Sequence, residues 1–160
     1  MQESEIIEKL NDIVLRLRDF PDIFNLKVQK YNNVANYFST KYNCTYLPAD
    51  FIGFMSILDG LNTEILTIFS IDEQNSSITM RYDEYASKEA IREYLKNIKT
   101  SSNLLFFACD DDGGRFAFKT DCQDNSVYYI NSKSPNMVMI YNSFLGFLID
   151  KIELYILKKI

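Results

Sequence analysis

Three consecutive aspartates followed by two glycines form the most distinctive polar segment of the chain, Asp110-Asp111-Asp112-Gly113-Gly114. Carboxylates at this density can pair with Lys and Arg side chains of a basic partner protein, because complementary charge steers association. Asp and Gly are also common turn residues for local backbone reasons, so a solvated β-turn is the alternative interpretation. A calcium site is a third alternative, but the spacing is not that of an EF-hand loop.

Two further groups of residues combine acids with a strand end or with aromatic rings. Asp121 and Asp124 lie at the far end of the same predicted hairpin strand and either extend the acidic surface or flank a turn. The segment Tyr82-Asp83-Glu84 has the composition of an interface hot spot, and the alternative is a strand end with one buried tyrosine. The candidate partner-binding residues are therefore Asp110, Asp111, Asp112, Asp121, Asp124, Tyr82, Asp83 and Glu84.

Catalytic chemistry has few groups to work with. The chain contains no histidine, which removes the commonest general base and the usual Ser-His and Cys-His pairs. Cys44, Cys109 and Cys122 are far apart and form no CxxC motif; we expect Cys109 to be buried and the other two to be exposed. Glycine-rich phosphate-binding signatures are absent. We expect no catalytic residue, metal or cofactor, although paired carboxylates from distant positions stay open as an alternative.

Composition favours one globular domain with a protein partner. The 160 residues are 47% hydrophobic and 14% aromatic, enough to form a core without disulfides. A net charge of −5 and a single short basic pair, Lys158-Lys159, make nucleic acid and anionic membrane poor partners. Mild acidity for solubility alone is the simpler alternative to a basic partner. An odd number of cysteines, an acidic start and no long apolar run predict a cytoplasmic location.

Three helical patterns occupy the first part of the chain. Residues 4–18 carry apolar side chains at helical spacing, with Ser4 as the expected N-cap. A second stripe covers residues 28–42. The third helix is expected to begin with Pro48 in its first position and to stop at Gly60 in a left-handed conformation. Its buried face is expected to consist of Phe51, Phe54, Met55 and Leu58.

Strand patterns follow, and a helix closes the chain. The predicted strands cover residues 65–71, 104–109, 115–119, 127–130 and 137–140, with a short helix at 87–98. The last helix, 144–157, is capped by Ser143 and is apolar nearly all round, so it is either central to the core or covered by a partner such as a second copy of the chain. This order predicts an α+β domain in which an antiparallel meander packs with N-terminal helices and a C-terminal helix.

The order of these elements resembles the SUKH superfamily, which contains the yeast cell-wall-assembly regulator (Smi/Knr-like) domain and many bacterial immunity proteins. Leu47-Pro48 before an aromatic helix that ends in Asp59-Gly60 is similar to the family's opening motif. The hairpin from Leu104 to Asp121 resembles its central hairpin. The matching strand and closing helix are Val127-Tyr128-Tyr129 and Ser143-Phe144-Leu145-Gly146-Phe147-Leu148.

The resemblance covers about residues 28–150 and leaves residues 1–27 as an N-terminal helix extension of a single domain, 1–160. One departure is the absence of tryptophan, which the family often carries around its strands or helices. The resemblance implies an immunity-type protein that binds and neutralises a cognate bacterial toxin, expected to be basic and nuclease-like. The alternative that it implies is an intracellular regulatory module that binds proteins other than a toxin.

Overall fold

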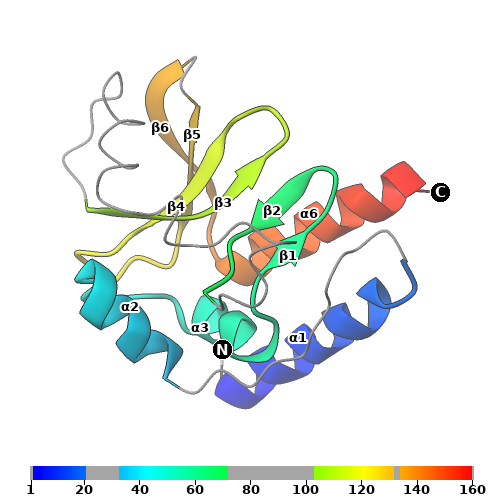
Figure 1. Ribbon diagram of the computed structural model, residues 1–160, viewed down its shortest axis with the longest axis horizontal. Coiled ribbons are helices and arrows are strands. Elements are labelled where there is room, and N and C mark those ends of the chain that lie inside the picture. Colours follow the sequence, from blue (N-terminus) through cyan, green and yellow to red (C-terminus); the bar gives the residue numbers. More distant parts are fainter. Residues whose placement is uncertain (1, 21–32, 72–102, 132–133, 160) are drawn as a thin grey trace.

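The computed structural model describes residues 2–20, 33–71, 103–131 and 134–159, with the side chains of 134–136 outside this description. Within these ranges the chain forms four helices and one six-stranded sheet (Figure 1). The elements are α1 (Glu3–Leu17), α2 (Val34–Tyr42), α3 (Ala49–Ile57), β1 (Leu61–Asn62), β2 (Leu66–Ile68), β3 (Leu104–Asp110), β4 (Arg115–Lys119), β5 (Val127–Asn131), β6 (Ser134–Tyr141) and α6 (Phe144–Lys159). The predicted helix at 87–98 lies outside the described residues.

The six strands form an antiparallel meander in which each strand pairs with the next along the chain, in the order β1 to β6. The prediction of an α+β domain, in which an antiparallel meander packs with N-terminal helices and a C-terminal helix, is confirmed. The structure shortens the predicted strand 65–71 to β2 and lengthens the last predicted strand to β6. Because the meander keeps sequence neighbours adjacent, β3 and β4 form a hairpin whose turn is the acidic segment.

The main core lies between one face of the sheet and the helices α3 and α6. The rings of Phe107 and Phe118 stack with their centroids 4.2 Å apart, and Phe51 of α3 lies 4.9 Å from Phe118. Phe144 and Phe147 of α6 contact the same strands. The face predicted for the third helix is confirmed, since Phe51, Phe54, Met55 and Leu58 are all buried. Phenylalanine rings packed in stacked, tilted and edge-to-face pairs thus fill the core in a chain without tryptophan.

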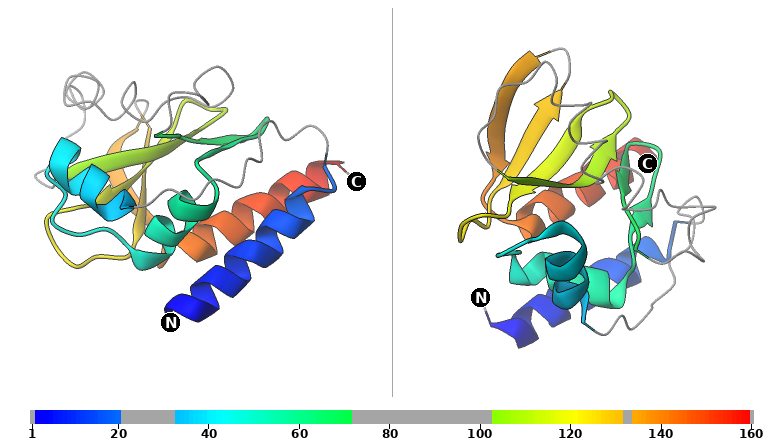
Figure 2. Two further views of the ribbon diagram at one scale, coloured as in Figure 1. Left: turned by 60° about the horizontal axis from the view of Figure 1, so that its bottom comes forward. Right: turned by 60° about the vertical axis from the view of Figure 1, so that its left-hand side comes forward.

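Helix α1 packs on the outer side of α3 and is also tied to α6 (Figure 2). Gly53 permits this close approach, because a β-carbon there would lie 3.3 Å from both Ile6 and Leu10. Arg16 of α1 forms a 2.7 Å ion pair with Glu153 of α6. The rings of Phe20 and Tyr155 meet edge to face, with centroids 5.8 Å apart.

Three predicted helix ends are corrected by the structure. Ser4 lies inside α1; the N-cap is Gln2, whose N–H donates to the Glu5 carboxylate, a bond of capping-box type. Pro48 is the N-cap of α3 and has extended backbone, so the first helical residue is Ala49. Gly60 does adopt the expected left-handed conformation (φ 89°), but α3 already ends at Ile57.

The start of α6 is held by two side chains. Ser143 Oγ accepts a hydrogen bond from the N–H of Gly146, which confirms the predicted cap. Asp50, buried in the first turn of α3, accepts from the N–H of Leu145 at 2.9 Å and from the N–H of Phe51 at 2.9 Å. One carboxylate therefore fastens the N-terminus of α6 to that of α3.

Candidate functional site

The β3–β4 turn is built around the side chain of Asp110, the last residue of β3. One carboxylate oxygen accepts hydrogen bonds from the N–H of Asp112 at 3.0 Å and of Gly114 at 2.7 Å. The other accepts from the hydroxyl of Tyr129 on β5 at 2.9 Å. The backbone N–H of Asp110 also donates to the carbonyl of Gly114. Both carboxylate oxygens of Asp110 are therefore used to hold the turn together and to tie it to β5.

The turn requires its two glycines for different reasons, one conformational and one steric. Gly113 has φ 79°, a left-handed conformation in which glycine is favoured. Gly114 is needed for space, because a β-carbon there would lie 1.9 Å from the hydroxyl oxygen of Tyr129. Burial raises the pKa of Tyr129, and the bonded Asp110 carboxylate adds to this while Asn131 acts in the opposite direction. The hydroxyl thus keeps its proton and remains a donor to Asp110.

A β-bulge in β3 turns Asp110 toward Tyr129. Phe106 pairs with Ala117, but Ala108 pairs with the adjacent Phe116, so β3 has one extra residue at this point. Phe107 and Ala108 consequently both point into the main core, whereas Phe106 lies in a second, smaller buried cluster. Without the extra residue, Asp110 would project from the opposite face of the sheet. The bulge is what places the acid beside the Tyr129 ring.

Asp111 and Asp112 occupy the tip of the turn and are exposed. The N–H of Asp112 donates to the Asp110 carboxylate, and Gly113 adopts the left-handed conformation that the turn requires. The two carboxylates therefore project from a turn with defined geometry. We call Asp111 and Asp112 the acidic tip. The hairpin that carries this pair is anchored to the sheet by the bond between Asp110 and Tyr129, and exposed carboxylates can pair with Lys and Arg side chains.

The other two predicted acids of this hairpin lie at the opposite end of β4. Lys119 pairs with Leu104 there, whereas Arg115 pairs with Cys109 beside the acidic tip. Asp121 is exposed. Asp124 accepts hydrogen bonds from the Tyr128 hydroxyl at 2.5 Å and the Ser126 N–H at 2.9 Å, so it flanks a turn. The structure therefore separates Asp121 and Asp124 from the acidic tip.

Local contacts account for the pKa shifts at that second end. Partial burial raises the pKa of Asp124, but the hydrogen bonds from Tyr128 and Ser126 and the charge of Lys119 outweigh it, and the net pKa is lowered. Burial and the bond to Asp124 raise the pKa of Tyr128 to about 12. The ammonium of Lys119 lies 4.5 Å from the centre of the Tyr128 ring. These contacts stabilise the turn before β5.

The remaining sequence candidates divide into those described and those not. Tyr82, Asp83 and Glu84 lie outside the described residues. Cys44 packs in the main core and is buried, contrary to the prediction. This burial raises the pKa of the Cys44 thiol to about 11. Cys109 is only partly buried, which corrects the expectation of full burial, and Cys122 is exposed as predicted.

The profile of the SMI1 / KNR4 family (SUKH-1) matches residues 37–150, more than half of the chain. The chain belongs to the SUKH-1 family. A search of curated proteins finds no significant match. The SUKH-1 region runs from within α2 to the second turn of α6 and includes the hairpin with the acidic tip.

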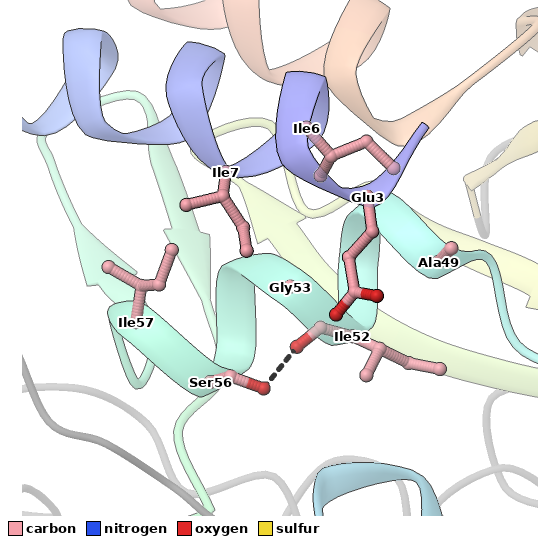
Figure 3. A pocket seen from close by; sticks show the side chains of 8 residues that line it. All are labelled: Glu3, Ile6, Ile7, Ala49, Ile52, Gly53, Ser56 and Ile57. Carbon is pink, nitrogen blue, oxygen red and sulfur yellow. Dashed lines mark hydrogen bonds between the residues drawn. The ribbon is translucent and has the colours of Figure 1, made fainter. Parts of the chain in front are cut away.

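Two segments outside the SUKH-1 region pack on each other. Helix α1 precedes the region and the C-terminal half of α6 follows it, and the Arg16–Glu153 pair joins them. An apolar groove of about 270 Å³ lies where α1 meets α3 (Figure 3). Ile6 and Ile7 come from α1, while Ile52 and Ile57 come from α3. The groove is thus formed jointly by the SUKH-1 domain and the helix that precedes it.

In the part of the chain that the structure describes, no three or more Cys, Asp or Glu side chains gather in a group that could hold a metal ion. Among the same residues, no helix combines the length and apolar character needed to cross a membrane.

Proposed function

We propose that this protein is an immunity-type SUKH-1 protein that binds and neutralises a cognate bacterial toxin in the cytoplasm. The toxin is expected to be basic and nuclease-like, and the acidic tip contacts its Lys and Arg side chains. The chain belongs to the SUKH-1 family, and the SUKH superfamily contains many bacterial immunity proteins, which supports a binding role. The observation that carries the proposal is an exposed pair of acids on a turn braced by Asp110 and Tyr129.

A braced acidic tip suits this task for two reasons. The turn geometry is fixed in the unbound protein, so little ordering is required when a partner docks. A nuclease must also present basic side chains to bind phosphates, and an acidic protein surface can occupy the same groups. The net charge of −5 also attracts a basic toxin at long range.

Co-expression tests the proposal directly. The protein is expressed with the toxin-like C-terminal domain encoded nearest to its gene, and growth of the host is followed. Restored growth together with co-purification of the two proteins is the expected result. Continued killing despite soluble expression of both proteins would refute toxin neutralisation for that pair and would favour the regulatory alternative.

A charge-reversal variant then tests the acidic tip. Asp111→Lys with Asp112→Lys should weaken binding to the co-purified toxin at least about tenfold while the melting temperature stays nearly unchanged, since both side chains are exposed. The matched control is Glu8→Lys with Asp12→Lys on α1, two exposed acids whose reversal changes the net charge equally. Equal loss of affinity in both variants would show a general charge effect and remove the acidic tip from the interface.

A further inference from the structure

The exposed side of α6 carries charged and apolar side chains in a symmetrical order. Leu154 is 47% exposed and Leu157 is 66% exposed, and Ile149 of the same helix is 40% exposed. Asp150 lies four residues before Leu154 and Lys158 lies four residues after it, and both are exposed. Residues four apart are neighbours on a helix surface, so Asp150, Leu154 and Lys158 form one continuous ridge.

This ridge is complementary to itself. If two α6 helices pack antiparallel about a two-fold axis at Leu154, each residue before Leu154 faces the residue equally far beyond it in the second copy. Asp150 then faces Lys158 of the partner subunit, and the same pair forms a second time by symmetry. Leu154 meets its own counterpart between the two ion pairs. A parallel arrangement would instead place like charges opposite one another.

Neighbouring charges on α6 do not oppose this arrangement. Glu153 is paired with Arg16 at 2.7 Å, and Lys151 lies 5.1 Å from the ring of Phe116 on the sheet side of the helix. The Tyr141 hydroxyl donates to one oxygen of Asp150 and holds that carboxylate in place. The ridge therefore presents one acid and one base at equal distances from an exposed leucine.

We infer that α6 is a homodimer interface, in which the ridge Asp150-Leu154-Lys158 packs antiparallel against the same ridge of a second copy. Most of this surface lies beyond the region matched by the SUKH-1 profile, so the interface belongs to this chain's own C-terminal segment. A contact between two single helices is smaller than a standard protein interface of about 1,600 Å², so the dimer should dissociate in the micromolar range. The inference does not depend on toxin binding.

Sedimentation velocity over about 1 to 200 micromolar protein measures the equilibrium. The wild type should show a concentration-dependent monomer–dimer transition. Asp150→Lys alone and Lys158→Asp alone should each raise the dimer dissociation constant at least about tenfold, because each turns two attractions into two repulsions. The double variant Asp150→Lys with Lys158→Asp should restore dimerisation, since it only exchanges the two charges. Leu154→Ser should abolish the dimer.

Controls separate the interface from the fold. Tyr141→Phe removes the hydroxyl that holds Asp150 and keeps the charge, so the dimer should survive, and circular dichroism checks that each variant is folded. A wild type that stays monomeric throughout the range overturns the inference. So does a dimer that tolerates both single reversals, which would place the contact elsewhere. A monomer whose α6 becomes protected from hydrogen exchange only when the co-purified toxin is added would assign this face to the toxin, and would also overturn it.

Discussion

Replacing Gly114 with alanine should destabilise the protein far more than replacing its neighbour Gly113. The added methyl carbon at position 114 would lie 1.9 Å from the Tyr129 hydroxyl oxygen and 2.2 Å from the adjacent ring carbon. The Tyr129 ring also packs on Phe116, with centroids 5.1 Å apart, so it cannot move away without loss of contact. Gly113 has open space around its α-carbon, and alanine there suffers only from the left-handed backbone.

The magnitudes follow from the contacts that are lost. Displacing Tyr129 breaks its hydrogen bond to Asp110, and a bond to a charged group contributes about 1.5–3 kcal/mol. Repacking the ring adds about 1–3 kcal/mol. Gly114→Ala should therefore lower the free energy of unfolding by about 3–5 kcal/mol. Gly113→Ala should cost about 1–2 kcal/mol, the penalty for an alanine in the left-handed region.

Urea unfolding followed by far-ultraviolet circular dichroism measures both variants, since the chain lacks tryptophan. A second substitution isolates the cause: Tyr129→Ala removes the ring, so adding Gly114→Ala to that variant should cost little more. Equal losses for Gly113→Ala and Gly114→Ala would refute the steric argument. Full additivity of Gly114→Ala and Tyr129→Ala would refute it as well, because residues that clash must be coupled.

Two further predictions concern buried groups. Burial raises the pKa of Asp50 above 3.8 despite the hydrogen bonds from Leu145 and Phe51. The folded protein then holds this proton more tightly than the unfolded chain, so the stability that Asp50 contributes is largest below pH 3.8 and declines as pH rises through the folded pKa. Urea unfolding of the wild type and of Asp50→Asn is measured at several pH values. The wild type should lose stability relative to the variant as pH rises from 3.8. The opposite trend would mean that the N-termini of the two helices lower the Asp50 pKa by more than burial raises it. Iodoacetamide near neutral pH should alkylate the exposed Cys122 first and the buried Cys44 only on unfolding, as read by mass spectrometry; early labelling of Cys44 would contradict its raised pKa of about 11.

Much of the fold could be predicted from the sequence because its signals are local. The strand at 115–119, the apolar run at 104–109 and the Ser143 cap each depend on a few neighbouring residues, and the structure contains all three. A meander also pairs strands in chain order, so the sheet order follows once the strands are known. The N-caps Gln2 and Pro48 were missed because neither is a preferred capping residue, whereas the nearby Ser4 is one.

The acidic residues of the candidate site could be found from the sequence, but their different environments could not. The sequence shows three equivalent aspartates, but the structure divides them into one half-buried acid bonded to Tyr129 and two exposed ones. The division depends on the bulge at Phe107–Ala108, which leaves no mark in the alternation pattern because both residues are apolar. It also depends on Tyr129, which is distant in sequence and meets the turn only through the register of β4 with β5. The adjacent Gly113-Gly114 pair was the one visible signal that a side chain must pass close by.

The same bulge supports the proposed use of the acidic tip as a recognition surface. Two exposed acids on a loose loop would have to be ordered on binding, at a cost in conformational entropy for each residue. Here Asp110 fixes the backbone of Asp112 and Gly114, and Tyr129 fixes Asp110 to the sheet. Asp110 and Tyr129 therefore act as positioning residues. Tyr129→Phe should weaken toxin binding less than reversal of Asp111 and Asp112, and it should do so without changing the net charge. If Tyr129→Phe destabilises the protein but leaves the affinity for the co-purified toxin unchanged, then bracing of the turn stabilises the fold and plays no part in recognition.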